Sequence, residues 1–190
     1  MGLADFTAYL ETESTGITGG MFNNFTSNNL VDVDFGVGMV FPTDNDYFNY
    51  FENNIINNAT IAYYVNLRGN ESHYIQLSDL NLTAGNTTLF AGQLTLVNSS
   101  YVNITRSNFS GNFYGILLVN SSNIIISGSK AWNNKDSFIL SFYDEGYPAG
   151  TAYAFINSHN ITLYNNNASS NNIGYYSRGS SNLNFTNNTA

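Results

Sequence analysis

Apolar and polar residues follow one short pattern four times in the second half of the chain. The copies begin at Asn98, Asn120, Asn157 and Gly179, at spacings of 22, 37 and 22 residues. Each copy is a polar turn followed by a strand whose alternate residues are apolar, as in Asn120-Ser-Ser-Asn-Ile-Ile-Ile. An apolar period of two is typical of strands, and repetition at such spacings is typical of a solenoid.

The repeats can be aligned by numbering each one from its leading residue, which we call position zero. Extending this numbering backwards places two further starts, at Asp44 and Glu71. Positions four and six are then apolar in all six repeats, and position eleven is apolar in the first five, as a second inward-facing strand. Position six holds Tyr50, Leu77, Ile104, Ile126, Leu163 and Phe185; position eleven holds Ile55, Leu82, Phe109, Ala131 and Ala168.

A third apolar strand follows near positions eighteen and twenty, as in Ile116 and Leu118. Three short strands per turn, each in register with the next coil, predict an all-β fold, a right-handed parallel β-helix of about six to seven coils. A β-sandwich also has short strands, but it does not require the same residue types at the same offsets. The repeat therefore favours the solenoid.

Asparagine recurs in register as well. Position ten reads Asn54, Asn81, Asn108, Lys130 and Asn167, and position fourteen includes Asn112, Asn134 and Asn171. Identical amides stacked about 4.8 Å apart can hydrogen-bond along the axis. Asparagine also tolerates the left-handed backbone of tight bends. We interpret these columns as structural ladders.

The predicted organisation has two parts and one insertion. Residues 1–43 fit the numbering badly and are predicted to be an irregular cap or a degenerate first coil, and residues 44–190 form the helix. The 37-residue spacing contains a loop at about 142–156, rich in Gly and Pro. The chain stops in mid-coil at Ala190, which suggests flanking protein or end-to-end self-association.

Composition excludes several classes of function. The net charge of −8 argues against nucleic-acid binding, which needs Lys and Arg. There is no cysteine for a disulfide or thiolate metal site, and no apolar run long enough to span a membrane. Met1–Phe6 does not resemble a secretory signal. Thirteen Asn-x-Ser/Thr sequons nevertheless favour an extracellular or cell-surface glycoprotein whose signal lies outside this chain.

The motif Asn-Ser-Ser-x-Ile-x-Ile, followed by Asn-x-Phe/Ala and a later Asn-x-x-Gly-Ile, resembles right-handed parallel β-helix repeat proteins of the pectate-lyase-like superfamily. The match covers roughly residues 44–190, and the Asn-rich form resembles cell-surface and periplasmic members. The resemblance implies the fold more than an activity, because that superfamily includes polysaccharide lyases, polygalacturonases, adhesins, tail spikes and copper-site maturation proteins. Paired aspartates with a downstream Gly-His-Gly, a catalytic signature of such enzymes, are absent from this sequence.

Position eight contains the strongest candidate for catalysis. It reads Glu52, Asp79 and Arg106 in consecutive coils. Two carboxylates about 5 Å apart would suit a retaining glycosidase, and their repulsion would raise one pKa for general-acid work. The alternative is that Asp79 pairs with Arg106 while Glu52 stays in water. We expect a structural or adhesin-like scaffold, with a polysaccharide lyase or glycoside hydrolase as the alternative.

Exposed aromatic residues beside amides and carboxylates suit sugar rings. Tyr114 and Trp132 are predicted to point outward, near Asp136 and the inserted Tyr143, so these four are the candidate carbohydrate-binding residues for a polysaccharide or cell-surface glycan. The alternative is that the insertion buries its own aromatics. His73 and His159 lie three coils apart, too far to share one metal ion. No cofactor is expected, although Asp32, Asp34, Asp44 and Asp46 could supply oxygens to Ca²⁺.

Overall fold

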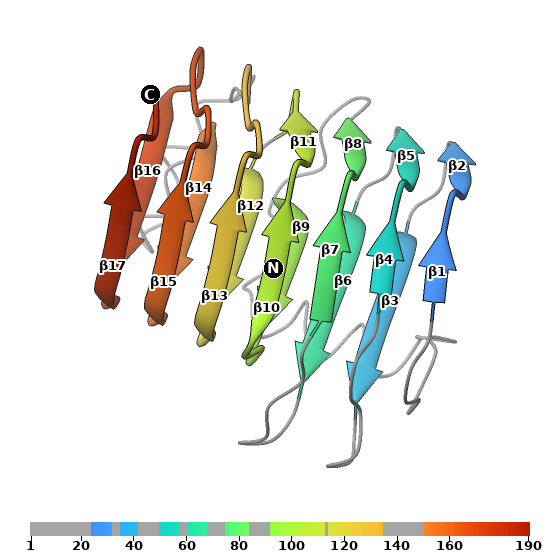
Figure 1. The fold of residues 1–190 in the computed structure, drawn as a ribbon, viewed down its shortest axis with the longest axis horizontal. Coiled ribbons are helices and arrows are strands. Elements are labelled where there is room, and N and C mark those ends of the chain that lie inside the picture. Colours follow the sequence, from blue (N-terminus) through green and yellow to red (C-terminus); the bar gives the residue numbers. More distant parts are fainter. Residues whose placement is uncertain are drawn as a thin grey trace, which may run out of the picture.

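The computed structural model describes residues 24–31, 35–41, 50–57, 61–67, 75–83, 92–112, 114–134 and 150–190. Every regular element in these ranges is a β-strand. The strands form three parallel sheets, and Figure 1 shows corresponding strands of successive coils side by side along the long axis of the molecule. The described residues therefore form an all-β parallel solenoid, as the repeat predicts.

The largest sheet has seven strands in the order β1-β4-β7-β10-β13-β15-β17. Its members are β1 (Asn24–Thr26), β4 (Tyr50–Glu52), β7 (Ile75–Ser78), β10 (Val102–Thr105), β13 (Ser122–Ser127), β15 (His159–Tyr164) and β17 (Ser181–Thr186). All of these strands end at position seven of the repeat, and β13, β15 and β17 begin at position two.

The second sheet has six strands in the order β16-β14-β12-β9-β6-β3. They are β3 (Phe35–Phe41), β6 (Ile61–Leu67), β9 (Gly92–Val97), β12 (Tyr114–Val119), β14 (Thr151–Ile156) and β16 (Ile173–Arg178). The third sheet, β11-β8-β5-β2, contains β2 (Asn29–Val31), β5 (Ile55–Asn57), β8 (Asn81–Thr83) and β11 (Asn108–Ser110).

Four turns of the described chain contain all three strands, fewer than the six to seven coils expected from the sequence. In the later turns the strand of the third sheet shortens to single bridges, Asn108 to Lys130, Lys130 to Asn167, and Asn167 to Thr189. The path of the backbone continues, but a lone bridge is too short to count as a strand. The fold class is confirmed, and the difference lies in how many turns are complete.

The register agrees with the repeat numbering in all but the first numbered coil. Ile104 lies opposite both Leu77 and Ile126, and Ile126 lies opposite Leu163. However, Phe51 lies opposite Leu77, and Tyr50 lies opposite Gln76. The first spacing is therefore 26 residues and not 27. Placing Tyr50 at position six, Ile55 at position eleven and Asn54 at position ten was wrong by one residue.

Two of the predicted boundaries, the start of the solenoid at residue 44 and the end of the inserted loop at residue 156, differ from the strands in the structure. β1, β2 and β3 pair with β4, β5 and β6, so residues 24–31 and 35–41 form a coil of the same solenoid. β14 is buried along its whole length, although the inserted loop was predicted to extend to residue 156. The loop boundary was wrong because Thr151–Ile156 is the apolar strand that pairs with β12. Residues 135–149 lie outside the described ranges.

Facing strands exchange large and small residues along the core. At position eleven, Phe109 is followed by Ala131 and Ala168 in the next two coils. Across the core, Ile116 is followed at its register position by Tyr153 and Tyr175. The larger aromatic ring thus enters where the facing side chain becomes smaller, which conserves packed volume. Tyr153 is fully buried and stacks on Tyr175, with ring centroids 5.3 Å apart.

Left-handed residues recur at four offsets, and they explain much of the asparagine content. Positive φ angles of non-glycine residues fall at positions zero, three, eight and thirteen. Positions zero, eight and thirteen lie in the bends between strands, whereas Asn123, Asn160 and Asn182 at position three lie inside β13, β15 and β17. Ten of the fifteen non-glycine residues with positive φ are asparagine, and they are Asn53, Asn98, Asn120, Asn123, Asn133, Asn157, Asn160, Asn165, Asn182 and Asn187. Asparagine is one of the few residue types that enters this region at low cost.

Candidate functional site

The candidate catalytic residues lie at the bend that follows the strands of the seven-stranded sheet. Position eight is left-handed in every described coil, including Asp79 with φ of 51° and Arg106 with φ of 47°. At such a bend the side chain projects from the corner of the coil. The bend gives each position-eight side chain a fixed outward direction, and successive coils place these side chains about 4.8 Å apart.

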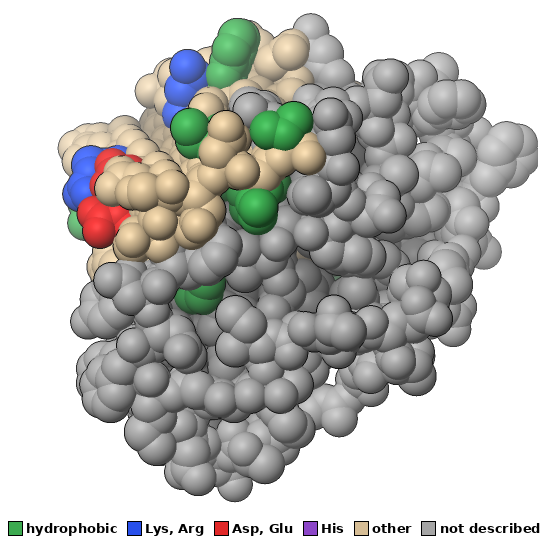
Figure 2. Space-filling view, turned by 90° about the vertical axis from the view of Figure 1, so that its right-hand side faces the viewer, with side chains coloured by type: hydrophobic (Ala, Val, Ile, Leu, Met, Phe, Trp, Pro, Cys, Tyr) green, Lys and Arg blue, Asp and Glu red, His purple; other side chains and the backbone are tan. Residues whose placement is uncertain are grey.

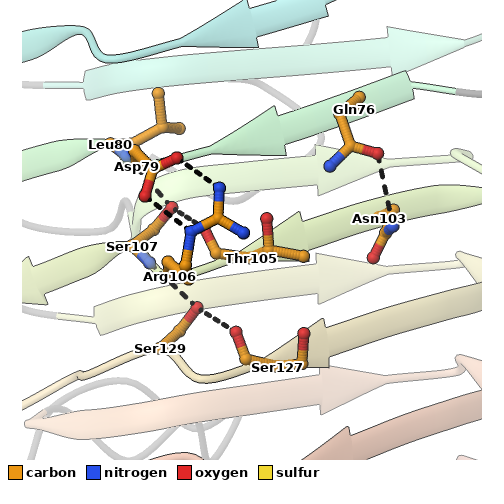
Figure 3. A network of polar contacts seen from close by, with 9 residues as sticks. All are labelled: Gln76, Asp79, Leu80, Asn103, Thr105, Arg106, Ser107, Ser127 and Ser129. Carbon is orange, nitrogen blue, oxygen red and sulfur yellow. Dashed lines mark hydrogen bonds and ion pairs between the residues drawn. The ribbon is translucent and has the colours of Figure 1, made fainter.

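Asp79 and Arg106 form a bidentate ion pair. Arg106 Nε donates to Asp79 Oδ1 at 2.8 Å, and Arg106 Nη2 donates to Asp79 Oδ2 at 2.5 Å. The hydrogen bond and the charge of Asp79 raise the pKa of the Arg106 guanidinium above its ordinary value. Figure 3 shows the guanidinium beside the carboxylate, with two of its nitrogens directed at the carboxylate oxygens. Both oxygens of Asp79 are therefore occupied by Arg106.

Glu52 does not belong to this column. It lies opposite Ser78 and pairs in register with Thr26, so it occupies position seven at the end of β4. The position-eight residue of that coil is Asn53, which has φ of 54°. The predicted stack of Glu52, Asp79 and Arg106 was therefore wrong at its first member, because the repeat there is one residue shorter.

The side chains around Asp79 and Arg106 are short, neutral and mostly tied to the backbone (Figure 3). Ser107 Oγ donates to the Thr105 carbonyl at 2.8 Å and accepts from the Leu80 N–H at 3.1 Å. Asn103 Nδ2 donates to Gln76 Oε1 at 3.2 Å. Among the residues labelled in Figure 3, Asp79 and Arg106 are the two with ionisable side chains. On the face of the molecule that Figure 2 presents, most of the described surface is uncharged. Acidic and basic side chains lie side by side at one edge, and a further basic side chain lies apart from them.

In the described part of the chain, this arrangement does not bring together the two carboxyl groups that a retaining glycosidase uses. Such an enzyme needs two carboxyl groups facing each other, one ionised and one protonated. Here one carboxylate is neutralised by a guanidinium that is 64% exposed, and the other candidate lies off the column. The geometry matches the alternative in which Asp79 pairs with Arg106.

Trp132 is the described candidate for carbohydrate contact that lies at the surface. It is 40% exposed at position twelve, and the Lys130 ammonium lies 4.8 Å from the centroid of its ring. Serine occupies the same position in the coils before and after, as Ser110 and Ser169. Ser110 and Ser169 hydrogen-bond the side chains of Asn108 and Asn167 respectively. The indole thus lies between two Asn-Ser pairs.

Tyr114 was predicted to face outward, and this was wrong. Only 4% of it is exposed, at the start of β12, where every residue is buried. A ring in this position cannot offer its face to a sugar at the surface. Asp136, Tyr143 and His73 lie outside the described residues, and so do the four aspartates considered for Ca²⁺. Within the described ranges, no group of three or more His, Cys, Asp or Glu side chains could hold a metal ion.

A column of serine side chains at position one, which the sequence analysis did not single out, bonds each coil to the next. At position one, the N–H of Ser99 donates to Ser121 Oγ at 3.1 Å, that of Ser121 to Ser158 Oγ at 3.1 Å, and that of Ser158 to Ser180 Oγ at 3.0 Å. Ser99, Ser121 and Ser158 are buried, with at most 1% of each exposed. The signal was present, since serine follows the leading Asn or Gly in all four phrases.

A second buried ladder runs through position nine. The N–H of Ser107 donates to Ser129 Oγ at 3.2 Å, that of Ser129 to Asn166 Oδ1 at 2.9 Å, and that of Asn166 to Asn188 Oδ1 at 2.9 Å. Position fourteen works in the same way, because the N–H of Asn134 donates to Asn171 Oδ1 at 2.8 Å. In each case a side-chain oxygen of one coil accepts from the backbone of the coil before it.

Amide-to-amide ladders occur as well. On the surface, Asn160 Nδ2 donates to Asn123 Oδ1 at 3.2 Å, and Asn182 Nδ2 donates to Asn160 Oδ1 at 3.0 Å. At position ten, Asn108 Nδ2 donates to Asn81 Oδ1 at 2.9 Å, which confirms the predicted stacking of amides at this pair. In the position-nine column, Asn166 Nδ2 donates to Asn188 Oδ1 at 3.0 Å, in addition to the bond from the backbone N–H.

The described part of the chain contains no helix that is long and apolar enough to cross a membrane. A scan against protein-family models matches no family, and no curated protein matches the chain.

Proposed function

We propose that the chain is an extracellular, adhesin-like scaffold, a stiff β-solenoid that presents a nearly uncharged polar surface to glycans. The observation that carries the proposal is the use made of its polar groups. Serine and asparagine side chains at positions one, nine and fourteen bond one coil to the next, and Asp79 is engaged by Arg106. Side chains committed to such bonds stabilise a framework and leave few groups for chemistry.

The resemblance of the repeats to pectate-lyase-like β-helices supports the same proposal, in the form of their adhesin members. The sequons, thirteen in all, support an extracellular or cell-surface location. Neither a cofactor nor a metal ion is needed for a scaffold. The alternative, a polysaccharide lyase or glycoside hydrolase, would rely on Glu52, Asp79 and Arg106. Their arrangement is less favourable for catalysis, because Arg106 binds both oxygens of Asp79 and Glu52 lies at position seven.

Glycan contact is proposed at Trp132. Its ring lies in a column with Ser110 and Ser169, and an aromatic face beside hydroxyl and amide groups suits a sugar, whose ring stacks while its hydroxyls take hydrogen bonds. Lys130 adds a cation beside the ring. The proposal is therefore a shallow contact on the outer surface of the coils, repeated weakly along a polysaccharide chain and strengthened by multivalency.

A glycan array combined with a polysaccharide-degradation screen tests the proposal. Wild type is expected to bind one or more glycans without degrading any, and Trp132→Ala should weaken that binding about tenfold. Tyr164→Ala is the matched control, because Tyr164 is equally exposed, at 40%, but lies on the seven-stranded sheet. Degradation that Asp79→Asn abolishes would overturn the scaffold in favour of the enzyme. If Trp132→Ala binds glycans as tightly as wild type, the assignment of glycan contact to Trp132 is wrong.

A further inference from the structure

The sequons in the interior coils differ in what their asparagine side chains bond. At four of them the amide is bonded to a side chain of a neighbouring coil. The bonds run from Asn103 Nδ2 to Gln76 Oε1 at 3.2 Å, from Asn108 Nδ2 to Asn81 Oδ1 at 2.9 Å, and from Asn160 Nδ2 to Asn123 Oδ1 at 3.2 Å. The amides of the sequon residues Asn81, Asn103, Asn108 and Asn160 are therefore part of the framework.

Asn167 occupies position ten, as Asn81 and Asn108 do, but its amide is not bonded to a neighbouring coil. In the position-ten ladder, Nδ2 donates to the side chain of the coil before it, and for Asn167 that residue is Lys130. A lysine ammonium has donors and no acceptor, so Lys130 interrupts the ladder. Asn167 Nδ2 accordingly has no acceptor among the described residues, and the side chain is exposed.

The orientation of the Asn167 amide is fixed within its own coil. Asn167 Oδ1 accepts from the Ser169 N–H at 2.9 Å and from the Ser169 hydroxyl at 2.6 Å. A backbone N–H can only donate, so the amide oxygen must face it and the amide nitrogen must point away. Ser169 is also the third residue of the sequon Asn167-Ala-Ser. A sugar on Nδ2 would leave both of these bonds in place.

Asn120 is a second sequon residue whose amide is not bonded to a neighbouring coil. It lies at position zero in the bend between β12 and β13, where its backbone is left-handed with φ of 49°. The side chain is exposed, and its amide bonds no other described residue. A sugar added at Asn120 would therefore displace no bond of the described framework.

We propose that Asn120 and Asn167 carry N-linked sugars, and that the four asparagines bonded to neighbouring coils do not. In the transfer, Nδ2 attacks C1 of a sugar that is activated as a nucleotide or lipid diphosphate. The bond from Nδ2 to C1 forms, the bond from C1 to the diphosphate oxygen breaks with its electron pair, and Nδ2 gives one proton to the transferase. A sugar on a bonded amide would crowd a coil about 4.8 Å away. The proposal rests on the proposed extracellular location and not on glycan contact at Trp132.

Mass spectrometry of the full chain, secreted from a eukaryotic cell, tests the assignment. Sugars should occupy Asn120 and Asn167 at least about tenfold more often than Asn103 and Asn108, because chains that lose a ladder bond fold less well and are depleted before secretion. Asn120→Gln and Asn167→Gln should each remove one glycan, and Asn108→Gln should remove none. An unmodified Asn167 in the secreted protein, or equal occupancy of the two groups of sequons, would overturn the proposal.

Substitutions of Lys130 test whether the ladder selects the site. Lys130→Asn gives Asn167 Nδ2 an acceptor on the coil before it, so occupancy of Asn167 should fall about tenfold while that of Asn120 stays unchanged. Lys130→Ala adds no acceptor and is the matched control, in which Asn167 should be modified as in wild type. If Asn167 is as fully modified in Lys130→Asn as in wild type, the ladder does not select the site and the proposal is wrong.

A second measurement separates the effect of the fold from that of the sequon itself. The folded chain, purified from a host without N-glycosylation, is treated with a soluble transferase that adds glucose from UDP-glucose to Asn-x-Ser/Thr. Asn167 should react at least about tenfold faster than Asn108 in the folded chain, and at a similar rate in peptides of residues 105–111 and 164–170. Equal rates in the folded chain would overturn the proposal. The same sugar-free chain serves the glycan array, so failure of the Trp132 contact is detected separately.

Discussion

Positions eight and nine of the repeat are consecutive in sequence and opposite in character. Position eight contains Asp79, Arg106, Gly128 and Asn165, which share a left-handed backbone and almost no chemistry. Position nine contains Ser107, Ser129 and Asn166, each at most 2% exposed and each bonded to the next coil. The exposed column varies freely because only its backbone angle is constrained. The buried column is restricted to short side chains whose oxygen reaches a backbone N–H.

This contrast shows where polar residues matter in the molecule. In the exposed column of position eight, Asp79 is a charged residue in a chain with few charges, but it pairs with Arg106, another charge at the surface. Plain serines and asparagines in the buried column satisfy backbone groups that would otherwise be orphaned away from water, at a cost of about 1–3 kcal/mol each. The following changes test this difference in order of decreasing effect.

Asn166→Ala should destabilise the fold most, by about 3 kcal/mol. Asn166 Oδ1 accepts from Ser129 N–H, and its Nδ2 donates to the Ile126 carbonyl and to Asn188 Oδ1. Alanine leaves the buried Ser129 N–H without its acceptor and removes a donor from the Ile126 carbonyl, while Asn188 Oδ1 still accepts from the backbone N–H of residue 166. Chemical denaturation measures the loss. The adjacent Asn165→Gly is the control and should stay within about 0.5 kcal/mol of wild type, since glycine accepts the left-handed angle. Equal effects at the two positions would remove the contrast.

Asn165→Val should destabilise by about 1–2 kcal/mol although the side chain is exposed, because a β-branched residue resists the left-handed backbone. Asn165 has φ of 57°. The comparison with Asn165→Gly isolates the backbone from the side chain. If valine and glycine variants unfold at the same denaturant concentration, the columns of positive φ do not constrain the sequence.

Alkaline pH should weaken the fold through Tyr175. Burial raises the pKa of Tyr175 from 10.0 to about 12. A phenol whose pKa is raised on folding is fully stabilising below pH 10, and this contribution is lost as the pH rises from about 10 through about 12. Because Tyr175 is only partly buried, solvent screening limits the effect. Denaturation of wild type and Tyr175→Phe across this window checks it: the variant should lose less stability, and parallel curves would contradict the assignment.

Asp79→Asn should have the smallest effect. The ion pair with Arg106 is exposed, and asparagine keeps the left-handed preference of the position, so the thermal midpoint should shift by less than about 2 °C. Scanning calorimetry at low and high salt measures this, with the small shift shrinking further as salt screens the charges. A shift as large as that of Asn166→Ala would mean that the pair carries the local fold.

The sequence predicts the stacking of this molecule well, because a repeat converts equal offsets into neighbouring residues. Ile104 over Leu77, Ile126 over Ile104 and Leu163 over Ile126 follow from apolar spacing alone. The prediction failed at Tyr50 and Glu52 because one residue is missing between the first numbered coils. A strand whose register slips by one exchanges its two faces, so this small miscount moved Glu52 off its column.

The candidate site is harder to predict, for reasons that concern individual side chains. Tyr114 is the first residue of β12, in which every residue is buried, and the alternation of residues along a strand cannot reveal that both of its faces are covered. The serine ladder was visible as Ser99, Ser121, Ser158 and Ser180, but a buried serine and a solvated turn serine look alike in a sequence. The direction of the bonds, from backbone to side chain, depends on a distance that only the structure supplies.

The account depends most on direct vertical pairing of coils, and one cross-linking measurement tests it. The chain has no native cysteine, so the double variant Asn103→Cys and Ile125→Cys reports only on this pair. These residues lie opposite each other in β10 and β13, with Cα atoms about 4.8 Å apart and outward-facing side chains. Mild oxidation should form an intramolecular disulfide in nearly every molecule, whereas Asn103→Cys with Thr162→Cys, two strands away, should remain reduced. A reduced Asn103/Ile125 pair in the folded protein would contradict the stack.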